Sequence, residues 1–128
     1  MMLSTDWAKR GELEIKLAGG IAISGLFDLV PILETSINDE VQLDMISAQR
    51  NSPSGFLPAN GAPFIAAVGG GETDEFLRQS RDYAAAWNDH SGDGQYLPLA
   101  KFHHFDVVCE LGRSGSELND AVIAQIGV

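Results

Sequence analysis

Two carboxylates and two imidazoles stand at positions from which they could act together. Glu72 and Asp74 follow the glycines Gly69–Gly71, and His103 and His104 follow the next apolar segment. A carboxylate beside an imidazole holds the tautomer of the ring and stabilises the imidazolium that forms when the ring accepts a proton. These residues therefore predict the acid and base of a nucleophilic hydrolase, which works only if a nucleophile is also present.

The sequence contains no recognisable nucleophile motif. There is no Gly-x-Ser-x-Gly, the strand-to-helix turn that presents a serine. The nearest string, Gly112–Ser116, lacks the last glycine and follows a predicted helix. A phosphate-binding Gly-x-x-x-x-Gly-Lys string is also absent, and Gly69–Gly71 do not fit the dinucleotide pattern. The histidines and acids show no metal-ligand spacing, so we expect neither a cofactor nor a metal.

Three segments have the composition of strands. The run Pro63–Val68 is apolar and uncharged, which predicts a strand buried on both faces. Gly19–Gly25 is a second candidate, and Tyr96–Phe102 is a third, placed near an edge because Pro98 lacks an amide proton. Ends of consecutive parallel strands lie roughly 5–10 Å apart. The acids and the histidines are therefore expected to be neighbours.

Helical spacing fills the stretches between these strands. In the clearest helix, Thr73–Trp87, the side chains of Tyr83, Ala84 and Trp87 share one stripe with Phe76, so we expect them in the core. The other expected helices are the last turns of a helix over 1–10, helices over 30–38, 41–50 and 105–111, and one capped by Ser116. Alternating strands and helices predict one α/β domain over residues 1–128, with three layers and about three parallel strands flanked by helices.

Composition excludes several classes of function. The 128 residues include 18 acids and 8 bases, for a net charge of −10. This charge repels phosphate backbones and anionic lipids, so we expect neither nucleic-acid nor membrane binding. A single cysteine, Cys109, excludes an internal disulfide and is typical of a reducing compartment, so we expect a cytoplasmic protein. We also expect Cys109 to be a small core residue.

Several strings together resemble a known family over nearly the whole chain. The most specific is Glu-Phe-x-Arg-Gln-Ser, which begins at Glu75; the others are Ser24–Leu29, Ser52-Pro53, Val68–Asp74 and His104-Phe105. Their order is similar to the C-terminal half of an α/β-hydrolase of the kynurenine formamidase (arylformamidase) and small esterase branch. The resemblance implies a partial α/β-hydrolase fold from which the nucleophile-bearing N-terminal half is absent.

The resemblance also implies roles for single residues. His104 matches the general base of the family, which is followed directly by Phe. The family acid is usually an Asp four residues before Phe, and Glu72 occupies that position. Asp74 remains the alternative acid, although a carboxylate in the first turn of a helix is also explained by the amide protons and the dipole there.

We therefore expect a fragment of a hydrolase that carries the acid and His of a Ser-His-acid triad and is inactive alone. The alternative is a non-enzymatic α/β remnant that acts as an oligomerising or binding module. The strand at Gly19–Ser24 would have an unpaired edge, and such edges pair with other chains. The expected partner is a second copy of the chain or a complementary N-terminal hydrolase half.

Overall fold

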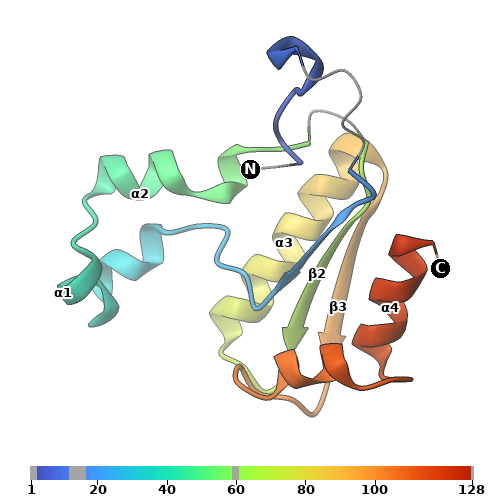
Figure 1. Ribbon diagram of the computed structural model, residues 1–128. Helices are drawn as coiled ribbons and strands as arrows, with labels where there is room; N and C mark the ends of the chain where they lie inside the picture. Colours follow the sequence, from blue (N-terminus) through green and yellow to red (C-terminus); the bar gives the residue numbers. More distant parts are fainter. Residues whose placement is uncertain (1–2, 12–16, 59–60, 128) are drawn as a thin grey trace.

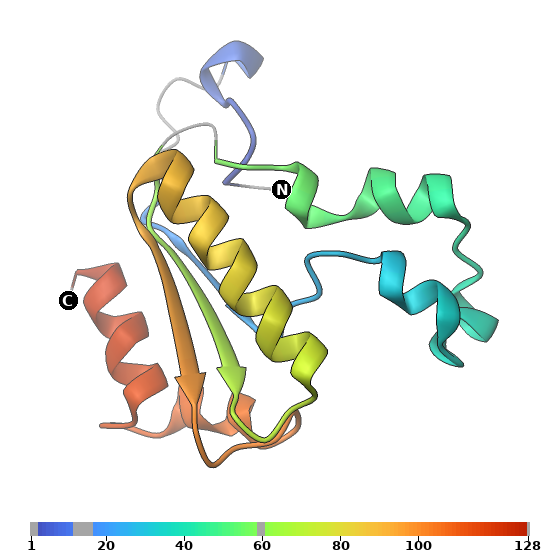
Figure 2. The same ribbon diagram turned by 180° about the vertical axis from the view of Figure 1, so that it is seen from behind.

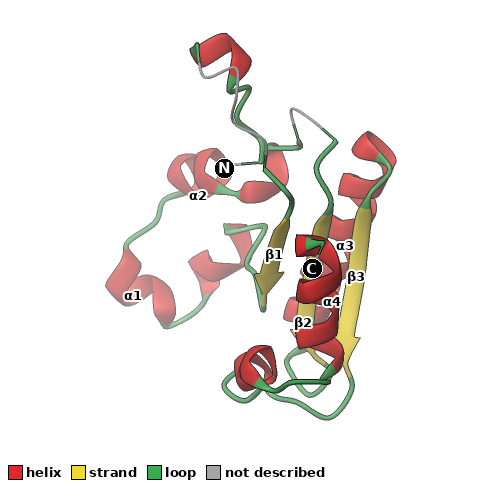
Figure 3. Cartoon of the chain, turned by 45° about the vertical axis from the view of Figure 1, so that its right-hand side comes forward, coloured by secondary structure: helices red, strands yellow, loops and turns green. Residues whose placement is uncertain are grey.

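A three-stranded parallel sheet forms the centre of the structure. The computed structural model describes residues 3–11, 17–58 and 61–127. The strands are β1 (Gly20–Ile23), β2 (Phe64–Gly69) and β3 (Gly94–Leu99), in the order β1-β2-β3. Both pairs are parallel (Figure 3). All six residues of β2 are buried. The predicted sheet is confirmed, with β3 at an edge.

Helices cover the two faces of the sheet. Helix α3 (Asp74–Ser91) lies on one face, and the 3₁₀ helix η4 (Val107–Gly112) and α4 (Glu117–Ile126) lie on the other (Figures 1 and 2). Successive β2 side chains point to opposite faces. The core on the α3 side contains Phe27, Phe64, Ala66, Tyr83, Ala84 and Trp87, and the core on the other side contains Ile65, Ala67, Leu97, Leu99, Val107 and Leu118. The predicted three layers are thus present.

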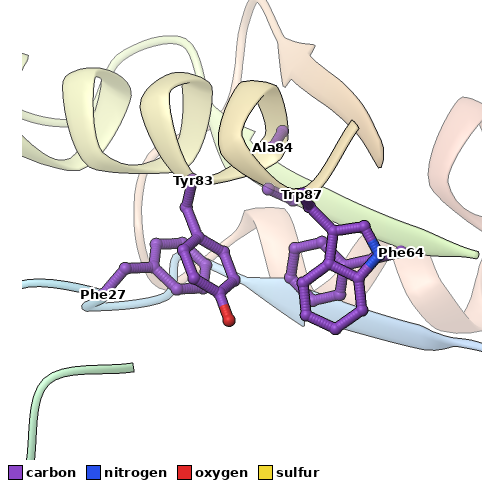
Figure 4. Close-up of a cluster of buried hydrophobic side chains, with 6 residues drawn as sticks. Phe27, Phe64, Tyr83, Ala84 and Trp87 are labelled. Carbon is purple, nitrogen blue, oxygen red and sulfur yellow. The ribbon is translucent and has the colours of Figure 1, made fainter. Parts of the chain in front are cut away.

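Aromatic rings fill the core beneath α3 (Figure 4). The rings of Phe27 and Tyr83 stack with centroids 4.2 Å apart, and those of Phe64 and Trp87 lie 4.7 Å apart. The indole of Trp87 is 2% exposed and donates to the carbonyl of Ala62 at 3.0 Å. The predicted burial of Tyr83 and Trp87 is confirmed, because both rings are used to attach α3 to the sheet.

The two long helices begin and end at recognisable residues. Thr73 is the N-cap of α3, which runs past the predicted end at Trp87 as far as Gly92, whose φ is 78°. At the start of α4, the hydroxyl of Ser116 accepts from the amide of Asn119 at 3.1 Å, as predicted. Glycine ends α3 because the left-handed conformation is accessible to it without strain.

The segment between β1 and β2 forms an arm that extends away from the sheet in both views (Figures 1 and 2). It contains η2 (Val30–Glu34), α1 (Ile37–Val41), α2 (Met45–Asn51) and η3 (Pro53–Gly55). The predicted helix over 41–50 begins too early, because Gln42 is left-handed, with φ 54°, and Asp44 caps α2. Ile46, an apolar residue of this predicted helix, is 74% exposed.

Two smaller predictions, on the first helix and on the cysteine, have mixed outcomes. The helix end predicted over 1–10 is the 3₁₀ helix η1 (Ala8–Arg10), while Met1 and Met2 lie outside the described residues. The expectation that Cys109 is a core residue is wrong: it is exposed, because Val107 and Glu110 are the residues of η4 that turn inward. Within the described ranges, no helix has both the length and the hydropathy needed to cross a membrane.

Candidate active site

A glycine turn after β2 places Glu72 at the end of the sheet. A Cβ atom on Gly69 would lie 2.3 Å from the carbonyl oxygen of Phe102, and one on Gly70 would lie 2.8 Å from Cα of Ala100. Only glycine allows this approach. The turn can therefore pack directly against the segment that follows β3, and this brings Glu72 close to the predicted histidines.

The carboxylate of Glu72 is buried, and both of its oxygens have hydrogen-bond partners. Its side chain is 1% exposed. Oε1 accepts from the hydroxyl of Ser24 at 2.5 Å and from the amide of Gly69 at 2.8 Å. Oε2 lies 2.8 Å from Nδ1 of His104. Since a carboxylate can only accept, the imidazole donates from Nδ1, and this fixes the ring as the Nδ1–H tautomer.

The ring of His104 faces outward from this contact. Its side chain is 46% exposed. The ring lies against Phe76, with centroids 5.1 Å apart, and against Phe105, with centroids 5.2 Å apart. Within the described part of the chain, Nε2 has no hydrogen-bond partner. His104 is therefore held on one side, and its second nitrogen is open to accept a proton.

The other two predicted candidates lie elsewhere. Asp74 is exposed in the first turn of α3, and the described residues show no hydrogen bond between it and His104. A negative charge at that end of a helix meets the positive end of its dipole. The ring of His103 packs on Gly71, and its Nδ1 lies 2.9 Å from the Gly71 carbonyl oxygen. The structure thus brings Glu72, and not Asp74, together with His104.

Sequence reasoning missed the part played by Ser24. We expected Ser24 only as part of the strand predicted over Gly19–Gly25, yet its hydroxyl contacts the carboxylate of Glu72. Its position in the sequence was the available signal. Ser24 directly follows β1, so it lies at the carboxyl end of the sheet, where Glu72 and His104 follow β2 and β3.

A second network attaches the segment after β1 to α3. The amide oxygen of Gln79 accepts from the backbone amides of Phe27 at 2.7 Å and Asp28 at 2.8 Å. Its amide nitrogen donates to the Asp28 carbonyl at 2.9 Å and to Glu75 at 2.8 Å. The guanidinium of Arg78 and this amide lower the pKa of Glu75 to about 2. Glu75, Arg78 and Gln79 belong to the string on which the family resemblance depended most. Within it, the side chain of Gln79 holds the segment after β1.

The carboxylate of Asp28 bonds to nearby backbone, because it accepts from the backbone amide of Val30 at 3.0 Å. Among the described residues, no group of three or more His, Cys, Asp or Glu side chains could hold a metal ion.

Comparison with known proteins gives relatives over the whole chain. No family model matches the sequence. It is 29% identical over 133 residues to a kynurenine formamidase from Salmo salar, and 30% identical over 132 residues to one from Danio rerio. Each match covers 99% of this chain and 45% of the relative. The chain therefore spans about half the length of the curated relatives it matches.

A solved structure gives the same result for the fold. The crystal structure of a candidate thioesterase from a Silicibacter species matches with a TM-score of 0.70 and 31% identity, covering 83% of this chain and 38% of that chain. The sheet and helices described above thus correspond to part of a larger hydrolase-like protein, and the predicted fold and family resemblance are confirmed. Over 99% of its length the chain is similar to kynurenine formamidases, and it spans about half the length of those relatives.

Proposed function

We propose that these 128 residues carry the acid and the base of a Ser-His-acid hydrolase that cleaves an ester or amide bond. The contact of 2.8 Å between His104 Nδ1 and Glu72 Oε2 carries the proposal. The homology to kynurenine formamidases supports the choice of bond, since a formamidase hydrolyses an amide of formic acid. The polar contacts of Glu72 and the exposure of Asp74 support Glu72 as the acid.

The two side chains have distinct tasks in this mechanism. Nε2 of His104 accepts the proton of a serine hydroxyl while the serine oxygen attacks the carbonyl carbon of the substrate. Glu72 keeps Nδ1 protonated, so that Nε2 is the acceptor, and its charge stabilises the imidazolium. His104 then gives the proton to the leaving group as its bond to the carbonyl carbon breaks, which leaves the acyl group on the serine. In the second half of the reaction His104 takes a proton from a water molecule while the water oxygen attacks the acyl carbon, and it returns that proton to the serine oxygen as the acid product is released.

The serine comes from polypeptide outside these 128 residues. The sequence has no Gly-x-Ser-x-Gly, and the matched relatives are about twice as long as the region they share with this chain. The 128 residues are therefore inactive alone. The partner in this proposal is a complementary hydrolase segment that presents its serine next to Nε2 of His104.

A complementation assay tests the proposal. The chain is mixed with a polypeptide equivalent to the part of the Danio rerio relative outside the match, and hydrolysis of a p-nitrophenyl ester is measured. We expect activity only in the mixture, a decrease of at least about a hundredfold for His104→Ala, and a clear decrease for Glu72→Gln. His90→Ala, an exposed imidazole in the last turn of α3, and Asp74→Asn are the matched controls and should retain activity. A mixture whose activity survives His104→Ala would contradict the proposal.

One observation supports the alternative of an oligomerising or binding module. The arm presents exposed apolar side chains to solvent, namely Ile37, Val41, Met45 and Ile46. Such side chains in one region are typical of an interaction surface, and β1 is an edge strand of the described sheet. Light scattering decides whether the isolated chain associates with itself: a mass of about twice 13.7 kDa or more indicates a homo-oligomer. Association together with a mixture that remains inactive would favour the alternative.

A further inference from the structure

The hydroxyl of Ser24 is placed to control the direction of the Glu72 carboxylate. Oγ lies 2.5 Å from Oε1, a length typical of a hydroxyl that donates to an ionised carboxylate. The Glu72 side chain is 1% exposed, so water does not readily replace this donor. We propose that Ser24 is a positioning residue that acts through Glu72 and aims its second oxygen at His104.

The backbone of Ser24 supports this role. Its φ is +50°, in the left-handed region that L-residues other than glycine rarely adopt. The other non-glycine residue with positive φ in the described ranges is Gln42, at the C-cap of α1, where this conformation is common. Ser24 ends no helix. It directly follows β1, and its amide still donates to the Ala67 carbonyl at 2.8 Å. Residues in such conformations persist where their surroundings hold them, and they gather at functional sites.

The contacts of Glu72 explain how Ser24 acts. Oε1 is held by Ser24 at the end of β1 and by the amide of Gly69 at the end of β2. With Oε1 fixed by two donors, Oε2 must face Nδ1 of His104, which follows β3. The terminal torsion of a glutamate is otherwise broad. If the hydroxyl is lost, one donor remains and the carboxylate can rotate, so Nδ1–H of His104 loses part of its acceptor.

The tautomer of His104 is a direct measure of this effect. The inference depends on the proposed function only for the name of the reaction, because the tautomer can be measured in the isolated chain. Nitrogen-15 NMR at about pH 9, where imidazoles are neutral, gives the ratio of Nδ1–H to Nε2–H for each histidine. We expect Ser24→Ala and Ser24→Gly to lower the ratio for His104 by about two- to tenfold, the effect of one hydrogen bond.

Two controls separate aiming from general damage to the fold. Ser47→Ala removes another serine hydroxyl bonded to a carboxylate, 2.6 Å from Asp44 in the arm, and should leave the His104 ratio unchanged. The ratio for His103, whose Nδ1 faces the Gly71 carbonyl, should be unchanged in all three variants.

The two Ser24 variants also differ in a useful way. Both lose the hydroxyl, but glycine adopts a φ of +50° without strain, so Ser24→Gly should fold even where Ser24→Ala does not. A folded Ser24→Gly chain with the wild-type tautomer ratio for His104 would overturn the inference. Loss of the fold in Ser24→Gly would also overturn it, because the hydroxyl would then be needed for folding and not for aiming. Failure of the complementation assay, by contrast, would leave the tautomer result intact.

Discussion

Replacement of Gln79 by Met should destabilise the protein far more than the same replacement at an exposed position. Gln79 is 3% exposed, and Met has a similar helix propensity. The change removes the acceptor of the Phe27 and Asp28 amides and a donor to the Asp28 carbonyl. A buried donor left without a partner costs about 1–3 kcal/mol. Phe27 is 6% exposed while Asp28 is half-buried and can regain water, so we expect a total loss of about 2–4 kcal/mol.

Urea unfolding, followed by tryptophan fluorescence, measures this loss. With a slope of about 2 kcal/mol per M of urea, the midpoint should fall by about 1–2 M. Gln49→Met, at an exposed position of α2, is the matched control and should shift the midpoint by less than about 0.3 M. Equal midpoints for the two variants would refute the reasoning, because they would mean that the segment after β1 finds other partners without free-energy cost.

Three further predictions concern the turn, the core and the surface of α3. Gly69→Ala should cost more than about 3 kcal/mol in chemical unfolding, because its Cβ would lie 2.3 Å from the backbone oxygen of Phe102; a loss below about 1 kcal/mol would contradict this. Burial raises the pKa of the Tyr83 phenol, so the stability that it provides is complete below the ordinary value near 10 and is lost as the pH rises through the raised value; absorbance at 295 nm should show a late-titrating tyrosine that Tyr83→Phe removes. The pKa of Glu75 is lowered to about 2 by Arg78, so its contribution is present above about 4.5 and is lost as the pH falls toward 2. Because this carboxylate is 39% exposed, Glu75→Gln should cost at most about 1 kcal/mol at pH 7 and nothing near pH 2 in thermal unfolding; a difference independent of pH would contradict it.

The parts of the fold that depend on buried composition could be predicted from the sequence. The run Pro63–Val68 has no charge, and in the structure β2 is buried along its whole length. The alternation of strands and helices predicts parallel strands, which end on the same side of the sheet, and this placed Glu72 and His104 close together.

The arm could not be predicted in detail, because local hydrogen bonds decide its turns. The side chain of Asn38 accepts from the backbone amide of Leu43 at 2.7 Å and donates to its carbonyl at 3.1 Å, which closes a turn in the middle of a helical pattern. The helix predicted over 41–50 also contains the apolar residues Met45 and Ile46, yet both side chains are exposed. A pattern shows that a face is apolar but does not show whether the described residues include the surface that covers it.

The role of Ser24 was hidden for a related reason. A serine before a glycine at the end of a strand is what any turn would contain, and nothing in the residue types shows that Ser24 itself is left-handed or that its hydroxyl meets a buried acid. The Glu-Phe-x-Arg-Gln-Ser string carried the family resemblance, but the residue types alone do not show what its side chains contact. Only the structure shows that its Gln79 holds the loop directly after Ser24.

The contacts that orient Glu72 and the serine that the proposed reaction needs come from different parts of the polypeptide. Glu72 receives one group from the end of each strand: the Ser24 hydroxyl after β1, the Gly69 amide from β2 and the His104 ring after β3. All of these contacts lie within the 128 residues, whereas the proposed nucleophile lies outside them. The arrangement of the proposed acid and base therefore does not depend on the proposed nucleophile, and it can be measured in these 128 residues alone. This separation is why the tautomer of His104 and the complementation assay test different statements.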